Sequence, residues 1–403
     1  MSAIRLEDLD HEQLADLARE HLLAGQLIDR AGMPVVIAHG RDTMRDVAIE
    51  EWMGASPIYA KRMQRLLGFE GDTVETCLKG MQLDIGAPPE FMDFRYTVID
   101  DRHGLFHLDH CGALMDVEPM GDDYVKAMCH DIEDPTFDAT GWATNPRLRM
   151  RPVHRPPRTP VDRHPHCSWT VEIDESVEPT PAPKEAERIG TSFAASLPLA
   201  QIDAVEGEAD GMLDYTKALD ADLVMRDFAS PALRAIVDEV TLQGHLLVMA
   251  FADAVQRRLG SEATTDAVNR QFTGVAGVMA ERLRHAFDLD GGVDSLATVF
   301  ELHPAFHPRT YVDWSVEAVE GAVHLELGEC PATEESFGSW MTAIASGEDR
   351  ALSAIAAGVD PHWHVRRDGP RRWVVEWGNT EVDELAEVTL TKFSSGVAFG
   401  FER

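Results

Sequence analysis

RDTMRDVAIEEWMGASPIYAKRMQRLLGFEG, at residues 41–71, decides the fold because it returns in altered form as SEATTDAVNRQFTGVAGVMAERLRHAFDLDG at residues 261–291. Trp52 lies opposite Phe272 in the ungapped alignment, and apolar positions mostly match apolar positions. The identical pairs are Asp46/Asp266, Gly54/Gly274, Ala60/Ala280, Arg62/Arg282 and Gly71/Gly291. The alignment predicts an internal duplication in which both halves carry amphipathic helices.

Strand-like sequence follows the helices of the first half. Residues 91–99 are rich in aromatic and β-branched residues and predict a strand, and residues 105–111 predict its hairpin partner. Residues 121–134 have the pattern of a helix, and residues 147–153 and 166–173 predict two more strands. Similar elements follow in the same order in the second half. The sequence therefore predicts an α+β fold of two tandem related units, each with helices followed by a small antiparallel sheet with one inserted helix.

A segment rich in Pro and Glu, ESVEPTPAPKEAE at residues 175–187, separates the two halves. Such a composition is typical of a linker. We therefore expect an N-terminal α+β domain at residues 1–174, a linker at 175–189, and a C-terminal degenerate repeat of the same fold at 190–403. The repeat is expected to end with a strand at residues 388–401.

The 403-residue chain carries 70 acidic and 36 basic residues, which gives a net charge of −34. Nucleic acids and anionic membrane surfaces need a basic footprint, so this charge argues against both as partners. No apolar run approaches the roughly 18–20 residues of a membrane helix, and the acidic N-terminus lacks the pattern of a signal peptide. We expect a cytoplasmic protein whose five cysteines are reduced thiols.

Residues 104–173 concentrate the side chains that carry chemistry, with three of the five cysteines among six histidines and several acids. On the predicted helix Cys129 lies on the apolar face, and Glu133 follows one turn later. Thiolate, imidazole and carboxylate ligands suit zinc, or iron when some coordination positions stay open. We therefore predict that five side chains converge as metal ligands: Cys111, Cys129, Glu133, His166 and Cys167.

The same stretch allows two other interpretations. A thiolate that is activated by a neighbouring imidazole would be a nucleophile, and a histidine would serve as general base near neutral pH. The candidates for this catalytic group are His110, Cys111, His130 and Asp134. Alternatively, the cysteines are buried and act as small hydrophobic side chains. The spacing of the cysteines matches no standard zinc-finger pattern.

Six arginines lie between residues 147 and 163 of this acidic chain, both ends included. A guanidinium binds a carboxylate or phosphate group with two hydrogen bonds. We expect most of these arginines to pair with the protein's own acids and one or two to hold a substrate anion. The candidates for substrate binding are Arg151, His154 and Arg155. The sequence has no phosphate-binding glycine loop, so no nucleotide cofactor is expected.

The order of these motifs resembles the L-2-amino-thiazoline-4-carboxylate hydrolase-like family, over roughly residues 35–175. The motifs are a cysteine, a second cysteine followed closely by acids, and an arginine-rich stretch that ends in His-Cys-x-Trp-x-Val. The matching residues are His110-Cys111, Cys129 to Asp134, and Arg158 to Val171. Members of that family are similar to the vinyl-reductase type of small-molecule-binding domain, an α+β unit in which cysteines hold a structural zinc in some sensors.

The resemblance implies a hydrolase that breaks C–N or C–S bonds in a small heterocycle, with a small anionic substrate such as a cyclic amidine or thiazoline carboxylate. The expected cofactor is a transition metal, zinc or iron. Two alternatives remain open: a small-molecule-binding or sensing protein with a structural zinc, and an iron-dependent oxidative enzyme. The expected partners are a small-molecule substrate and, in a homodimer, a second copy of the chain.

Overall fold

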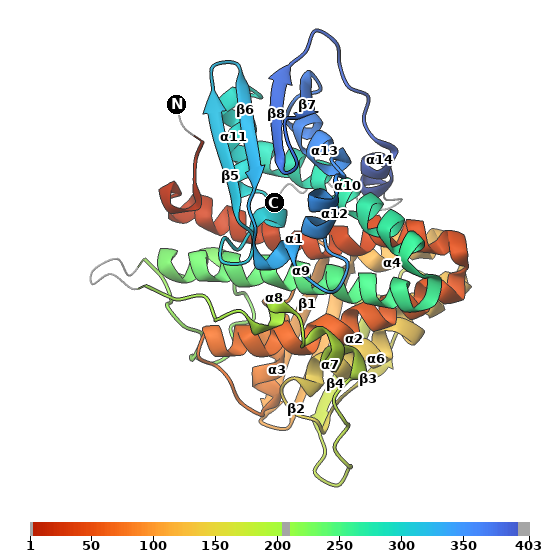
Figure 1. The fold of residues 1–403 in the computed structure, drawn as a ribbon. Helices are drawn as coiled ribbons and strands as arrows, with labels where there is room; N and C mark the ends of the chain where they lie inside the picture. The colour runs from red at the N-terminus through yellow and green to blue at the C-terminus, as the bar shows by residue number, and fades with distance from the viewer. Residues whose placement is uncertain (1–2, 204–209, 394–403) are drawn as a thin grey trace.

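A computed structural model describes residues 3–203 and 210–393 of the chain. One sheet contains β1 (Met92–Asp100), β2 (His103–Cys111), β3 (Leu148–His154) and β4 (Cys167–Ile173), and the other contains β5 (Trp314–Val319), β6 (Ala322–Leu327), β7 (Trp363–Arg367) and β8 (Arg372–Trp377). Both sheets are antiparallel, with the strand orders β1-β2-β4-β3 and β5-β6-β8-β7. They lie at opposite ends of the molecule with long helices between them (Figure 1). The predicted α+β fold of two similar units is confirmed.

The first unit begins with three helices, α1 (His11–Val36), α2 (Arg41–Leu66) and α3 (Val74–Met81). The single helix predicted at residues 121–134 is instead a series of shorter elements between β2 and β3, which includes α4 (Gly112–Val117), α5 (Asp122–Lys126), the π-helical turn η4 (Ala127–Ile132) and α6 (Glu133–Trp142). Gly121, with φ at +100°, precedes α5 in a conformation that favours glycine. Pro135 lies in the first turn of α6, where the missing N–H is tolerated.

The second unit repeats this order with α9 (Ser230–Leu259), α10 (Ser261–Ala286), α11 (Val293–Leu302), α12 (Trp340–Ser346) and α13 (Arg350–Val359). The strand predicted at residues 388–401 is wrong where it can be compared, because α14 (Ala386–Lys392) is helical. The rest of that prediction, from residue 394, lies outside the described residues. Gly274 and Gly277 of α10 have no side chains, so Thr391 and Val388 of α14 lie directly against the α10 backbone. This packing favours a helix here, although the β-branched residues of the segment prefer strands.

The two units are joined by a reciprocal pair of buried ion pairs. Arg62 of α2 donates two hydrogen bonds of 2.7 Å to Glu239 of α9. Arg282 of α10, which the alignment places opposite Arg62, donates hydrogen bonds of 2.5 and 3.0 Å to Glu20 of α1. Each arginine therefore crosses to the other unit and meets an acid at the matching position. The exchange supports the duplication and aligns α1 with α9.

The aligned glycines mark a second reciprocal contact between the units. A Cβ atom at Gly54 of α2 would lie 2.9 Å from the Cβ atom of Ala250 in α9. A Cβ atom at Gly274 of α10 would lie 3.1 Å from the Cβ atom of Ala31 in α1. Helices that cross this closely need a residue without a side chain at the crossing. Both units therefore have a glycine at the aligned position because both helix crossings have the same geometry.

The two units share one large hydrophobic core. A single cluster of buried apolar side chains includes residues of α1, α2, α9, α10 and the second sheet, whereas the first sheet has a smaller cluster of its own. The predicted linker at 175–189 ends in α7 (Lys184–Ile189), which packs against α2, and Ile189 is fully buried. A further short helix, α8 (Phe193–Ser196), follows. The segment between the units is thus partly structured and docked.

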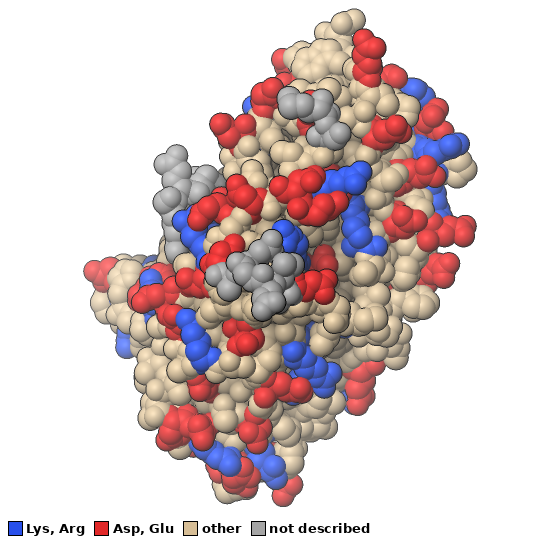
Figure 2. All heavy atoms as spheres, turned by 90° about the vertical axis from the view of Figure 1, so that its left-hand side faces the viewer, with Lys and Arg blue, Asp and Glu red and all other residues tan. Residues whose placement is uncertain are grey.

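Helix α9 is long and apolar enough to cross a membrane by length and composition, which the sequence analysis did not anticipate. Most of its apolar stretch is buried inside the structure, at the centre of the shared core. A central core helix is apolar on most of its circumference for this reason. On the face shown in Figure 2, acidic and basic side chains are dispersed among other residues and form no single large basic patch.

Candidate functional site

The first unit contains a cavity of about 100 Å³ between its helices and its sheet. Its polar walls come from α1, α2, the segment after α3 and the start of α6, and they consist of Gln26, Asp29, Trp52, Tyr59, Asp84, Glu133, Thr136 and Thr140. Its apolar walls include Met81, Met92, Phe94, Met128, Ile132 and Phe137. Ligand sites in proteins commonly combine such an apolar lining with a few convergent polar groups.

Asp84 is fixed at one side of the cavity. One of its oxygens accepts a 2.8 Å hydrogen bond from the Tyr59 hydroxyl and a 2.7 Å hydrogen bond from the Gly86 backbone N–H. Burial raises the pKa of Asp84 to about 6, while these hydrogen bonds act in the opposite direction. Burial and the nearby Asp84 also raise the pKa of the Tyr59 hydroxyl well above its usual value. Both groups are therefore held in position before any ligand enters.

Asp29 of α1 and Glu51 of α2 form a second acidic group. Burial raises the pKa of Asp29 to about 6, partly offset by the charge of Arg30. Glu51 has 0% of its surface exposed, and burial, followed by the charge of Asp29, raises its pKa well above the ordinary value. The charge of Glu51 also acts on Tyr59, although Glu51 itself does not line the cavity.

Several of these carboxyl oxygens have no partner within the described parts of the chain. They are Oδ1 of Asp29, both carboxyl oxygens of Glu51 and Oε2 of Glu133. A buried polar atom without a hydrogen bond costs about 1–3 kcal/mol. Native proteins contain few such atoms, and a cluster of them calls for a donor such as water or a ligand.

Glu133 connects the cavity to the cysteine-rich stretch that the sequence singled out. It follows the π-helical turn η4, an element that is frequent at functional sites, and it lines the cavity. Burial raises the pKa of Glu133 to about 8, although Arg155 acts to lower it. The pKa values of three cysteines are raised, mainly by burial and secondly by the charge of Glu133: Cys111, Cys129 and Cys167. The charge of Glu133 therefore acts on all three thiols.

The thiols are buried and neutral. Burial raises the pKa of Cys111 to about 12 and raises those of Cys129 and Cys167 well above their usual value. The Cys111 sulfur accepts the Leu114 backbone N–H, which caps α4, and lies 3.7 Å from the Met92 sulfur. All three cysteines belong to the hydrophobic cluster of the first sheet. This environment is that of small hydrophobic side chains rather than of activated thiolates.

The predicted metal ligands do not fit a metal centre in this conformation. Across residues 3–203 and 210–393, no group of three or more His, Cys, Asp or Glu side chains is placed to hold a metal ion. His166 is buried, and burial and the charge of Arg158 lower its pKa to about 4. Its ring centroid lies 5.0 Å from that of His164 and 6.2 Å from that of His110. Zinc or iron at these residues therefore stays a prediction, and we build no chemistry on it.

Four of the remaining predicted catalytic and substrate-binding residues bond to other groups: His130, Asp134, Arg151 and Arg155. His130 forms a 2.7 Å hydrogen bond through Nε2 with the Pro156 carbonyl oxygen, and Asp134 is paired with Arg155. Arg151 is paired with Asp138 at 2.9 Å, and Arg158 with Glu118 at 2.7 Å. Burial and the charge of Arg163 lower the pKa of His154. The expectation that most of these arginines pair with the protein's own acids is confirmed, and the substrate anion stays a prediction.

The sequence analysis missed the cavity acids outside the cysteine-rich stretch. Glu51 lies on one face of α2 with Val47 and Ala55, both fully buried. An acid on an otherwise apolar helix face is a signal that was present in the sequence. Asp29 and Asp84 carry a weaker signal, because only the tertiary fold brings α1 and the segment after α3 together.

The second unit has no acid at the matching positions. The alignment of α1 with α9 places Val248 at the position of Asp29, and the alignment of α2 with α10 places Gln271 at that of Glu51. His303 occupies the position of Asp84, because each side chain accepts a hydrogen bond from the backbone N–H two residues later. His303 accepts from Ala305 at 3.2 Å, and Asp84 accepts from Gly86. Burial lowers the pKa of His303 to about 3, so it is neutral.

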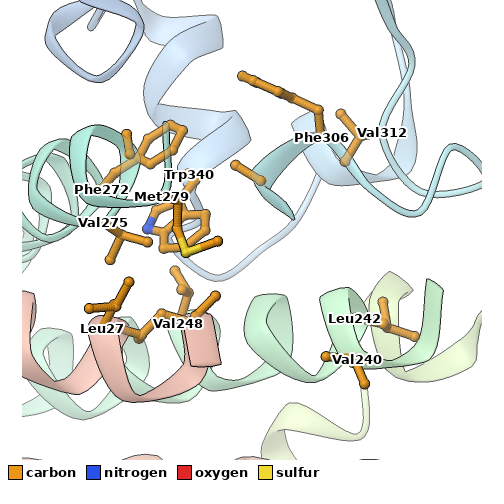
Figure 3. Close-up of a cluster of buried hydrophobic side chains, with 14 of the residues drawn as sticks. Leu27, Val240, Leu242, Val248, Phe272, Val275, Met279, Phe306, Val312 and Trp340 are labelled. Atoms are coloured by element: carbon orange, nitrogen blue, oxygen red, sulfur yellow. The ribbon is translucent and has the colours of Figure 1, made fainter. Parts of the chain in front are cut away.

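Large side chains fill the corresponding space in the second unit. Met279 and Phe272 occupy the positions of Tyr59 and Trp52, and they gather with Trp340 near α9 and α1 (Figure 3). Trp340 stacks on Phe272 with ring centroids 4.7 Å apart, and its Nε1 donates a 3.3 Å hydrogen bond to Gln271. The first unit therefore has a polar cavity, whereas the residues at the matching positions of the second unit are uncharged and packed.

Known proteins do not identify this chain. Family models, curated proteins and solved structures give no match. The resemblance to the thiazoline-carboxylate hydrolase-like family therefore stays a prediction from the motifs of residues 110–171. The function must be argued from the cavity itself.

Proposed function

We propose that the first unit binds a small organic molecule in the cavity lined by Asp29, Asp84 and Glu133, and that the second unit serves mainly as its structural partner. The observation that carries this proposal is the contrast between the units. The same helical framework encloses unpaired carboxyl oxygens in the first unit and packed side chains in the second.

The acids are costly for the stability of the fold, which supports a functional reason for them. Neutral replacements are structurally acceptable at these positions, because the second unit carries Val248, Gln271 and His303 there. Acids that are buried without partners lower the free energy of unfolding. A bound molecule that donates hydrogen bonds to them would recover that loss.

The size of the cavity limits the part of the molecule that is buried. An apolar cavity of about 150 Å³ holds benzene, so about 100 Å³ accommodates a group of only a few heavy atoms. Phe94, Phe137 and Trp52 provide apolar contacts around this group. A larger ligand would place only its head group here, because the cavity is not closed off from solvent.

Hydrolysis of the bound molecule is the second candidate function. It is favoured by Glu133, because a carboxyl group with a pKa of about 8 is protonated at neutral pH and can donate a proton to a leaving group. The hydrolase class is also the one that the sequence motifs imply. A Glu133→Gln variant whose rate of conversion falls far more than its affinity for the molecule would support this role.

The binding proposal is tested by thermal unfolding and intrinsic tryptophan fluorescence in the presence of small amines, amidines, amides and carboxylates. Trp52 lines the cavity and reports on its occupation. Ala113→Leu fills the cavity from α4, and Ala195→Leu in α8 is a control at a similarly half-buried site away from it. We expect the shift in midpoint temperature to disappear in Ala113→Leu and to persist in Ala195→Leu. The proposal is contradicted if no compound binds, or if Ala113→Leu binds as well as the unchanged protein.

A further inference from the structure

The cavity presents an excess of hydrogen-bond acceptors to whatever occupies it. Its carboxyl groups project from three separate elements: Asp29 from α1, Asp84 from the segment after α3, and Glu133 from the start of α6. Glu51 of α2 adds a fully buried carboxyl group whose two oxygens find no partner in the part of the chain that the structure describes. Because Asp29, Asp84 and Glu133 come from three elements rather than from one exposed segment, their charges converge on one cavity.

Four side chains that could donate to an occupant already donate within the protein: Tyr59, Gln26, Thr136 and Thr140. The Tyr59 hydroxyl donates to Asp84, and the Gln26 side-chain amide donates a 2.8 Å hydrogen bond to the Gly86 carbonyl oxygen. A carboxylate ionised in this space can only accept hydrogen bonds. The occupant must therefore supply N–H or O–H donors.

The basic residues closest to these acids are engaged by other acids. Arg30 lowers the pKa of Asp29 but is paired with Asp116. Arg155 lowers the pKa of Glu133 but is paired with Asp134. Lys and Arg are absent from the residues that line the cavity in the described structure. The local charge of the site is therefore negative once its carboxyl groups ionise, and an anionic occupant would be repelled.

Aromatic side chains add a second attraction for positive charge. Trp52, Phe94 and Phe137 line the same cavity, and the face of an aromatic ring attracts a cation that lies within about 6 Å of its centre. The second unit has uncharged residues at the matching positions, Val248, Gln271 and His303, beside packed aromatic side chains. Since the related framework forms without these acids, the acids serve the occupant rather than the fold.

We propose that the cavity holds a small organic cation, with a protonated amine or amidine group between the carboxyl groups of Asp29, Asp84 and Glu133. This inference rests on the proposed binding function and names the class of its ligand. An amidinium group has several N–H donors in one plane, and its charge compensates the ionised carboxyl groups. Its few heavy atoms suit the volume of the cavity.

Acetamidinium and acetamide provide the sharpest test, because they have nearly the same shape and differ in charge. Isothermal titration calorimetry of the full chain at pH 8 should show binding of acetamidinium at least tenfold tighter than binding of acetamide. Methylammonium should bind measurably, and acetate should not. Affinity for acetamidinium should fall at least tenfold in Asp29→Asn and in Asp84→Asn, and stay within twofold in Glu262→Gln, a control in α10 outside this cavity.

The outcomes separate this inference from the binding proposal. If acetamide or acetate binds as tightly as acetamidinium, the cationic ligand class is wrong while the cavity remains a binding site. If none of the four compounds binds, both the ligand class and the binding proposal are contradicted. The comparison of ligands uses the unchanged protein, so it stands even where a variant fails to fold.

Discussion

The interiors of the two units differ far more than their frameworks. Both units keep the crossing helices, and both keep the arginine that reaches across to the other unit, Arg62 in one and Arg282 in the other. Inside this shared frame, the first unit has acids around a cavity, and the second has Trp340, Phe272 and Met279 packed together. The contrast teaches that the helix interface constrains the sequence of both copies, whereas the interior was free to diverge.

The largest expected effect comes from breaking the shared frame. Arg62→Ala leaves the buried Glu239 without its partner, and removing one member of a buried pair costs about 3–5 kcal/mol. Arg282→Ala should cost a similar amount through Glu20. Urea denaturation measures both free energies of unfolding. A loss below about 1 kcal/mol in either variant would show that the two crossings are not equivalent.

Opening the second unit should be nearly as costly but should not create a cation site. Trp340→Ala removes a large buried side chain and is expected to lower the free energy of unfolding by about 3 kcal/mol. The new space would be lined by Phe272, Met279 and the neutral Gln271. We therefore expect calorimetry to show acetamidinium binding with unchanged stoichiometry. A second bound equivalent in Trp340→Ala would mean that a cavity suffices without the acids.

Replacing the buried Glu51 of the first unit should stabilise the protein above the ordinary pKa of a glutamate. Burial raises the pKa of Glu51 in the folded protein. Above the ordinary pKa of a glutamate, the unfolded chain therefore releases this proton while the folded protein still binds it. Its contribution to stability is therefore present at low pH and is lost as the pH rises. We expect Glu51→Gln, which copies Gln271, to raise the free energy of unfolding by about 1–3 kcal/mol at pH 8 and to leave it nearly unchanged at pH 4. Equal effects at both pH values would contradict a buried, protonated Glu51.

The smallest predicted effect is the pH dependence of cation binding. The pKa values of Asp29 and Asp84 are about 6, and that of Glu133 is about 8, because all three are buried. Arg30 lowers the pKa of Asp29, and Tyr59 lowers the pKa of Asp84. Arg155 lowers the pKa of Glu133, whereas Asp134 raises it. The charge of Asp29 in turn raises the pKa of Glu51. These acids lose their charge as the pH falls, so affinity for acetamidinium should weaken about tenfold, or 1.4 kcal/mol, between pH 8 and pH 5. An affinity that is independent of pH would exclude ionised carboxyl groups as its partners.

The fold could be predicted from the sequence where local constraints repeat. Gly54 and Gly274 align because both helix crossings exclude a side chain, and Arg62 and Arg282 align because both find an acid in the other unit. Residues 388–392 were predicted as part of a strand, and three of these five residues are β-branched. They form a helix because the small residues of α10 accept it, a fact of tertiary packing.

The candidate site was only partly predictable. The sequence led to Glu133 and its three neighbouring cysteines, because thiols and acids are rare together. It could not tell reactive thiols from buried hydrophobic ones, since that difference lies in the surroundings of each sulfur. Asp29 and Asp84 stand on different elements far apart in the chain, and only the packed structure shows that they share a cavity with Glu133.

The central claim is that the first unit holds a ligand site which the second unit has lost. Its most direct test is calorimetric titration of acetamidinium into the unchanged chain and into a triple variant, Asp29→Val, Glu51→Gln and Tyr59→Met, that copies the second unit. Circular dichroism would first establish that the variant is folded. The account predicts one bound equivalent for the unchanged chain and none for the folded variant. Equal binding by both proteins, or binding by neither, would contradict it.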